Sequence, residues 1–306
     1  MATNNWTITD IPDLTGKTVI VTGGNSGLGF ESVKVFALKG ARVILASRSL
    51  SKGEEAKKQI LKFLPSAEIE VMELDLTDLK SIRNFATSFK KNHIRLDVLL
   101  NNAGIMMVPY GLTKDGFENQ MGTNHLGPFA LTGLLMEALK STPASRVVNV
   151  SSMAHSTGKM DFTNLLYENG KDYTSVKAYS RSKLSNLLFT YELQRFFERN
   201  NINSIALAAH PGFSDTNLVN HLMNKWYFRI LMPLIFKMSQ PASMGALPLI
   251  RASVDPAAKP NEFYGPDGKR QMSGYPIVVE PKAKAYDSEN ARKLWEASEK
   301  LTSVIY

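Results

Sequence analysis

The feature of the sequence that most constrains the fold is a short apolar run that ends in a dense cluster of glycines. Residues 19–21 read Val-Ile-Val, the β-branched composition typical of a parallel strand that is buried on both faces. The glycines that follow are Gly23, Gly24, Gly27 and Gly29. Apolar residues then recur at helical spacing up to Gly40, a typical helix stop. The stretch therefore predicts a strand, a tight turn and a helix.

This turn has the features of a site for the pyrophosphate of a dinucleotide. Where side chains are missing, the backbone can come close to the phosphates, and the start of the helix offers free N–H groups and a positive dipole end. A plain strand-to-helix turn is the structural alternative, but the strand before the glycines and the helix after them favour phosphate binding. The residues of this stretch expected to contact the cofactor are Gly23, Asn25, Ser26, Gly27, Leu28 and Gly29.

Strand and helix patterns alternate along most of the chain. Further strands are expected at residues 42–46, 69–74, 97–100, 146–150, 202–209 and 262–265, and further helices at 51–64, 79–91, 117–139, 177–199, 242–251 and 287–300. Gly127-Pro128 should disturb the helix at 117–139 locally. The alternation predicts an α/β fold of the doubly wound (Rossmann) type, with a mostly parallel sheet of about seven strands and helices on both faces.

No internal repeat or linker divides the chain. We expect residues 1–15 to be an N-terminal extension and residues 16–306 to form a single dinucleotide-binding catalytic domain. Within it, the apolar segment 214–240 is expected to be a substrate lid, or else to pack on the core or on a partner subunit. Its most apolar part, residues 226–236, is shorter than the ~20 residues that cross a bilayer, although it can lie on a membrane surface.

Composition excludes several functions. The chain has no cysteine, which rules out disulfides, thiolate metal sites and a thiol nucleophile, and its five histidines lack metal-ligand spacing, so no metal is expected. The net charge of +8 is spread along the chain without a dense basic run, which favours a solvated surface over nucleic-acid binding. Because the first fifteen residues lack a signal-peptide pattern, we expect a cytoplasmic protein, with peripheral membrane contact as an option.

The residues after the second and third strands bear on the choice of cofactor. A carboxylate after the second strand would bind the adenosine ribose and repel a 2′-phosphate, but Ser47 stands there and Arg48 follows. A guanidinium can pair with phosphate in a bidentate way, so NADP(H) is expected over NAD(H), unless Arg48 is merely an exposed residue at a strand end. Asp75, followed by Leu76, is expected to accept a hydrogen bond from the adenine amino group, with helix capping as an equally good alternative.

Four side chains can supply the chemistry of hydride transfer to a carbonyl. Tyr179 and Lys183 are four residues apart on an expected helix and so share a face, where the lysine cation would favour the phenolate of a group that otherwise titrates near 10. Ser152, at the end of a strand, can donate to the substrate oxygen, and Asn124 can hold a water that relays the proton. Taken singly, each of these residues also has an ordinary structural explanation.

The order of these features resembles the short-chain dehydrogenase/reductase family over about residues 16–217. The matching residues are Thr22-Gly-Gly-Asn-Ser-Gly-Leu-Gly29, Asn101-Asn-Ala-Gly104, Asn124, Ser152, Tyr179 with Lys183, and Pro211-Gly212. The resemblance implies that Tyr179 is the acid/base, Lys183 its helper, Ser152 the substrate-orienting hydroxyl and Asn124 the relay residue. It also implies that further cofactor contacts come from Asn102, Ala103, Gly104, Pro211, Gly212 and Thr216.

Within this family, residues 123–127, 151–155, 182–186 and 209–212 look most like the retinol dehydrogenase and WW-domain oxidoreductase branch. Light-dependent protochlorophyllide reductases share part of the pattern, but this chain lacks the cysteine that they carry. Together with Arg48 and the apolar segment 216–239, the resemblance favours an NADP(H)-dependent oxidoreductase acting on a lipophilic carbonyl or alcohol. A homodimer or homotetramer is an option that the family offers. The alternatives are a double-bond reductase of the protochlorophyllide type and a non-catalytic NADP-sensing protein.

Overall fold

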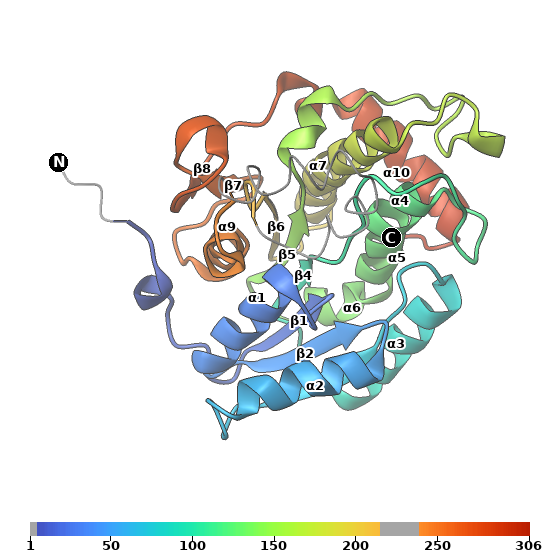
Figure 1. Ribbon diagram of the computed structural model, residues 1–306. Coiled ribbons are helices and arrows are strands. Elements are labelled where there is room, and N and C mark those ends of the chain that lie inside the picture. Colours follow the sequence, from blue (N-terminus) through green and yellow to red (C-terminus); the bar gives the residue numbers. More distant parts are fainter. Residues whose placement is uncertain (1–4, 215–238) are drawn as a thin grey trace.

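A mostly parallel sheet forms the centre of the molecule. The computed structural model describes residues 5–214 and 239–306, and its sheet has the strand order β3-β2-β1-β4-β5-β6-β7-β8 (Figure 1). The strands are β1 (Thr18–Thr22), β2 (Arg42–Ser47), β3 (Ile69–Glu73), β4 (Val98–Asn101), β5 (Ser145–Val150), β6 (Ser204–Ala209), β7 (Phe263–Pro266) and β8 (Pro276–Val278). Only the last pair, β7 with β8, is antiparallel among the described strands.

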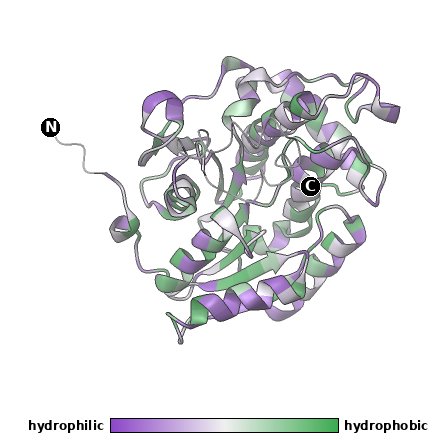
Figure 2. Ribbon diagram, viewed as in Figure 1, coloured by the Kyte–Doolittle hydropathy of each residue, from purple (hydrophilic) through white to green (hydrophobic). Residues whose placement is uncertain are grey.

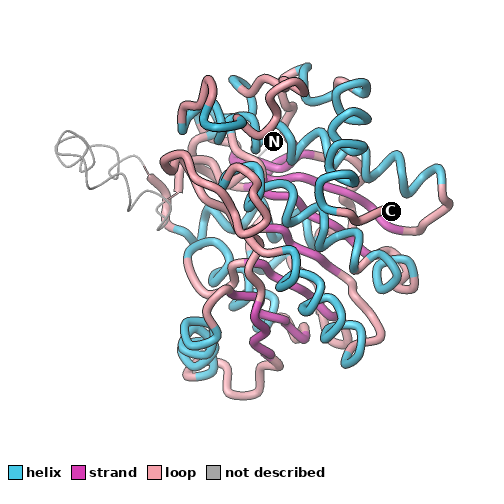
Figure 3. The backbone as a smooth tube through the Cα atoms, turned by 90° about the vertical axis from the view of Figure 1, so that its right-hand side faces the viewer, coloured by secondary structure: helices cyan, strands magenta, loops and turns pink. Residues whose placement is uncertain are grey.

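Helices cover both faces of this sheet (Figure 3). They are α1 (Gly27–Leu38), α2 (Leu50–Leu61), α3 (Leu79–Asn92), α4 (Asn119–Met121), α5 (Gly127–Leu134), α6 (Met136–Lys140), α7 (Ser175–Arg199), α9 (Ala242–Val254) and α10 (Ser288–Thr302). Two hydrophobic cores include residues of β1: one also contains residues of α1, α2 and α9, and the other contains residues of α3, α5, α6 and α7. A third core contains residues of α7 and α10. The predicted doubly wound α/β fold is confirmed.

The alternation of side chains along β1 produces these two cores. Val19 and Val21 pack with Phe36 in one core, whereas Ile20 between them packs with Phe85 in the other. Both faces of the strand are therefore buried, as the Val-Ile-Val run predicts. The hydropathy colouring shows the central strands as hydrophobic, with hydrophilic residues gathered on the outer helices (Figure 2).

Two features of the fold differ from the prediction. The sheet has eight strands rather than about seven, because β8 adds three residues at its edge, of which Ile277 and Val278 are exposed. The helix expected at 117–139 is divided into α4, a π-helical turn at Gly122–Leu126, α5 and α6. Pro128 lies in the first turn of α5, where its missing N–H is tolerated, so the predicted disturbance at Gly127-Pro128 is confirmed.

The segment expected to be a lid falls mainly outside the described residues. Residues 215–238 are not described, and they include Thr216 and the apolar stretch 226–236. The described ends of the segment meet, since Ser214 and Gln240 form a parallel bridge and both hydrogen-bond to the carbonyl oxygen of Pro211. Among the helices that the structure describes, none is both long and apolar enough to span a membrane.

Candidate active site

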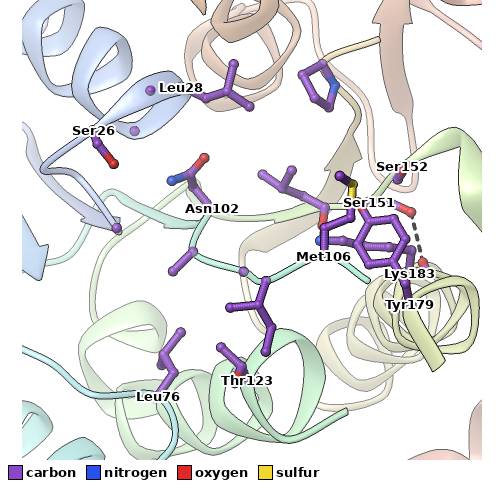
Figure 4. A pocket seen from close by; sticks show the side chains of 18 of the residues that line it. Ser26, Leu28, Leu76, Asn102, Met106, Thr123, Ser151, Ser152, Tyr179 and Lys183 are labelled. Carbon is purple, nitrogen blue, oxygen red and sulfur yellow. Dashed lines mark hydrogen bonds between the residues drawn. The ribbon is translucent and has the colours of Figure 1, made fainter. Parts of the chain in front are cut away.

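A cavity of about 630 Å³ lies at the carboxyl ends of the parallel strands. In a doubly wound sheet this is the edge where ligands bind, next to the point at which the strand order reverses between β1 and β4. The predicted site residues on its wall are Gly23, Asn25, Ser26, Gly27, Leu28, Gly29, Arg48, Asp75, Leu76, Asn102, Ala103, Gly104, Ser152, Tyr179, Lys183, Pro211 and Gly212. Ser26, Leu28 and Asn102 lie across the cavity from Ser152, Tyr179 and Lys183 (Figure 4).

The glycine turn forms a cradle in which side chains do not fit. Gly23 and Gly27 have φ angles of +66° and +53°, in the left-handed region that favours glycine. A Cβ on Gly29 would overlap the carbonyl oxygen of Gly23 and would lie 2.7 Å from the amide nitrogen of Asn102. This backbone packs against the start of a 12-residue helix, and the arrangement fits the pyrophosphate of a dinucleotide.

The turn after β4 is tied to the end of β1 through Thr22. The Thr22 hydroxyl accepts hydrogen bonds at 3.0 Å from the backbone N–H groups of both Asn102 and Ala103. The Asn102 side-chain amide in turn donates to the carbonyl oxygen of Thr22 at 2.8 Å. These hydrogen bonds hold the end of β1 against the turn after β4, beside the cradle.

Arg48 and Asp75, the two charged residues expected to contact the adenosine part of the cofactor, both line the cavity. Arg48 is exposed on the cavity wall, and the Ser47 hydroxyl donates to Asn25 at 3.1 Å. Burial raises the pKa of Asp75, but hydrogen bonds from Thr77 and the charge of Lys114 outweigh it, so the pKa lies below its usual value. Asp75 is therefore charged at neutral pH, with the ammonium of Lys114 3.5 Å away.

The Ser152, Tyr179 and Lys183 side chains meet at the other end of the cavity. Tyr179 is 5% exposed, and the Ser152 hydroxyl is near enough to its phenol to lower the pKa of the phenol. The Lys183 ammonium lies 5.8 Å from the centre of the Tyr179 ring and donates to the carbonyl oxygen of Val150 at 3.0 Å. Ser151 secures the same region, because its hydroxyl donates to the carbonyl oxygen of Lys183 at 2.8 Å.

Burial governs the titration of this pair. It raises the pKa of Tyr179 to about 12 against the opposing hydrogen bond from Ser152, and it lowers the pKa of Lys183 to about 8. The direction for Tyr179 is opposite to the lowering expected from a neighbouring cation, because burial is the largest cause of the shift. The phenol therefore carries its proton at neutral pH, the form that a proton donor needs.

Asn124 lies in the π-helical turn behind the cavity, not on its wall. Its side-chain oxygen accepts from the N–H of Ile105 at 2.8 Å, and its amide donates to the Ile105 carbonyl and to the Ser182 hydroxyl, each at 2.9 Å. The residue thereby fixes the chain after Gly104 against α7. Its role in a proton relay stays a prediction.

The wall beside Tyr179 contains apolar residues that the sequence does not single out. They are Ile105, Met106, Met107, Met153 and Phe213. Gln120 and Tyr173 hold the first three in place, because Gln120 accepts from the N–H of Met107 at 2.7 Å and Tyr173 donates to the carbonyl of Val108 at 2.7 Å. Their position directly after Gly104, Ser152 and Gly212 is the signal in the sequence that points to them.

A cradle for a pyrophosphate and a Tyr–Lys–Ser group at opposite ends of one cavity define a dinucleotide-dependent oxidoreductase. The comparison with known families agrees, since the model of the short chain dehydrogenase family matches residues 17–226. The chain belongs to the short-chain dehydrogenase/reductase family, in the branch of retinol dehydrogenases and the WW domain-containing oxidoreductase. It is therefore a dehydrogenase/reductase of a family that uses nicotinamide cofactors.

The similar proteins cover nearly the whole chain. Human retinol dehydrogenase 12 is 39% identical over 295 residues, which are 95% of this chain and 88% of that protein. Human WW domain-containing oxidoreductase is 38% identical over 296 residues, or 94% of this chain and 69% of its own length. A crystal structure of an uncharacterized protein from Mycobacterium paratuberculosis is 41% identical, with a TM-score of 0.82 and 98% of both chains covered.

Proposed function

We propose that this chain is an NADP(H)-dependent oxidoreductase that interconverts a lipophilic carbonyl compound and its alcohol, with Tyr179 as the general acid/base. The observation that carries the proposal is the contact of Ser152, Tyr179 and Lys183 at one end of the cavity whose other end is the glycine cradle. When bound, the nicotinamide cofactor supplies or accepts the hydride.

The two hydroxyls are arranged to act on one oxygen atom. Because the Ser152 and Tyr179 hydroxyls lie close together on the cavity wall, a carbonyl oxygen beside them can accept from both. As hydride reaches the carbonyl carbon, the C=O π electrons move to the oxygen, and the Tyr179 proton follows to give the alcohol. The Lys183 cation next to the ring then stabilises the phenolate that remains, and in the reverse direction this phenolate removes the alcohol proton.

The methionine-rich wall supports an apolar substrate. Met106, Met107 and Met153 present flexible thioethers to the cavity beside the reacting hydroxyls, and Phe213 adds an aromatic face. The similar proteins named retinol dehydrogenase suggest a long isoprenoid aldehyde such as retinal as the first compound to test. We expect NADPH oxidation with at least one member of a panel of aliphatic, aromatic and isoprenoid carbonyls. No turnover with any of them would contradict the proposal.

Met106→Gln tests the apolar wall. Burying an amide against a hydrocarbon chain costs about 1–3 kcal/mol, so KM for retinal or a long-chain aldehyde should rise by roughly 10- to 100-fold. KM for a short aldehyde that does not reach the wall should change little. Met244→Gln serves as the control, because Met244 is partly buried on α9 and does not line the cavity. Equal effects on long and short aldehydes would show that Met106 does not contact the substrate chain.

Arg48→Ala tests the preference for NADP(H). Loss of a bidentate guanidinium–phosphate pair should weaken NADPH binding by about 10- to 100-fold, or about 1.4–2.7 kcal/mol, with little loss for NADH. Titration calorimetry with both cofactors gives the two affinities. Arg42→Ala is the matched control, because Arg42 is an exposed arginine at the other end of β2, paired with Glu68. A similar loss for both cofactors would mean that Arg48 does not recognise the 2′-phosphate.

A further inference from the structure

His155 makes two buried hydrogen bonds to backbone groups that are far apart in the sequence. The imidazole is 6% exposed, with Nδ1 2.7 Å from the carbonyl oxygen of Ser152 and Nε2 3.2 Å from the backbone nitrogen of Lys282. A carbonyl oxygen only accepts and a backbone N–H only donates. Nδ1 therefore carries the proton, and Nε2 is the acceptor. The ring is neutral with both nitrogens paired, and the proposed reaction does not use it directly.

These bonds fix Ser152, whose hydroxyl is near enough to Tyr179 to lower the pKa of the phenol. The Ser152 carbonyl receives the ring N–H of His155 and also its backbone N–H, the latter at 3.0 Å. The Ser152 hydroxyl meanwhile accepts from the N–H of Ala154 at 3.2 Å. The carbonyl and the side chain of Ser152 are thus both held by the turn that begins there.

The same turn is packed against α7 and against the C-terminal part of the chain. The Thr157 hydroxyl lies 3.0 Å from that of Ser180, next to Tyr179, and a Cβ on Gly158 would lie 2.5 Å from the Ser180 carbonyl oxygen. The Lys284 ammonium donates to the Gly158 carbonyl at 3.0 Å. The bond from Lys282 to His155 is therefore one of two that join residues 282–284 to the Ser152 turn.

We propose that His155 is a positioning residue for the reaction, whose neutral imidazole holds the Ser152 hydroxyl in place against Tyr179 and anchors this turn to the segment at Lys282. The inference rests on the proposed function. It assigns no contact with substrate or cofactor to His155. Its two bonds predict separate roles, with the bond to Ser152 setting the catalytic geometry and the bond from Lys282 holding the ring.

The surroundings of the ring keep it neutral. Burial lowers the pKa of His155, the bond to the Ser152 carbonyl opposes this, and the charges of Lys284 and Lys282 lower the pKa further. Phe263 packs edge-on to the ring at 5.7 Å, and the His210 ring also packs on Phe263, at 5.1 Å. Burial lowers the pKa of His210 to about 4, so His210 too is neutral at pH 7. Protonation of His155 would place a donor at Nε2 opposite the Lys282 N–H.

Three substitutions separate the two bonds. In His155→Asn the amide nitrogen can take the place of Nδ1 and still donate to Ser152, whereas in His155→Gln the amide oxygen can take the place of Nε2 and still accept from Lys282. His155→Phe keeps a ring against Phe263 and loses both bonds. We expect kcat to fall by about 100-fold in the Phe and Gln variants. The Asn variant should keep most of the wild-type kcat, and NADPH affinity should be unchanged in all three variants. His93→Phe is the control, because His93 is also a buried histidine and pairs with Glu70. This substitution should leave kcat unchanged.

The pH profile of alcohol oxidation gives a second readout. The Ser152 hydrogen bond lowers the pKa of Tyr179, so losing it should move the midpoint of the kcat profile to higher pH in the Phe and Gln variants but not in the Asn variant. If the wild type is active and His155→Phe has the same kcat and the same midpoint, the inference is overturned and the proposed function is not. The inference is also overturned if kcat of the Asn variant is as low as that of the Phe variant. A wild type that turns over no carbonyl compound or alcohol would overturn the proposed function, and the inference with it.

Discussion

Tyr179→Phe is expected to lower kcat for carbonyl reduction by about 10²–10⁴-fold, the usual contribution of a positioned general acid. The phenol lies beside Ser152 at the end of the cavity, and burial keeps it protonated. Phenylalanine keeps the ring and its packing but removes the only proton that this side chain can give. NADPH affinity should stay within about twofold, because the cradle is on the far side of the cavity.

Stopped-flow measurement of NADPH oxidation, with cofactor affinity measured separately, tests this expectation. Tyr191→Phe is the matched control, because Tyr191 is a buried tyrosine three turns further along α7, in the core below the sheet edge. It should keep the wild-type kcat. If Tyr179→Phe turned over at the wild-type rate, Tyr179 would not be the acid. A protein that only sensed NADP would bind the cofactor equally well with either residue and would show no turnover with either.

Gly29→Ala is expected to weaken NADPH binding by about 100-fold or more, equivalent to at least about 2.7 kcal/mol. The added methyl group would overlap the carbonyl oxygen of Gly23 and crowd the Asn102 amide. The first of these neighbours is backbone and cannot rotate away, so the glycine turn must open. The opening would move the N–H groups at the start of α1 that are expected to meet the pyrophosphate.

Gly133→Ala separates this effect from a general loss of stability. Gly133 is also a helical glycine, and a Cβ there would lie 2.6 Å from a methyl group of Val304, far from the cradle. We expect that variant to lower the midpoint of thermal unfolding while leaving NADPH affinity unchanged. Tight NADPH binding by Gly29→Ala would show that the pyrophosphate does not lie on this turn.

The parts of the fold that local patterns encode could be predicted from the sequence. Seven strands and the glycine turn follow from apolar runs and from the glycine and polar residues that end them. The predicted strand ends lie within two residues of the observed ones. β8 has three residues and two exposed apolar side chains, too little for a pattern to show. The division of the helix at 117–139 depends on a π-helical turn, for which only Gly127-Pro128 gives a signal.

The site, too, could be predicted only where local patterns encode it. Tyr179 and Lys183 are four residues apart on one helix, so their proximity follows from spacing alone, but spacing says nothing about burial, which here determines the pKa of both groups. The pairing of Lys114 with Asp75 joins separate loops, and the bond between His155 and Lys282 joins segments more than a hundred residues apart. Contacts of this kind arise from the tertiary fold and leave no trace in a local pattern.

Transfer of label from NADPH tests the central claim most directly. The protein would be incubated with NADPH deuterated on both positions of the nicotinamide C4 and with retinal or another carbonyl from the panel that supports turnover, and the product would be analysed by mass spectrometry. We predict an alcohol that carries one deuterium on the former carbonyl carbon, formed by the wild type and about 10²–10⁴-fold more slowly by Tyr179→Phe. Product without deuterium at that carbon, or equal label transfer by the two proteins, would contradict the account.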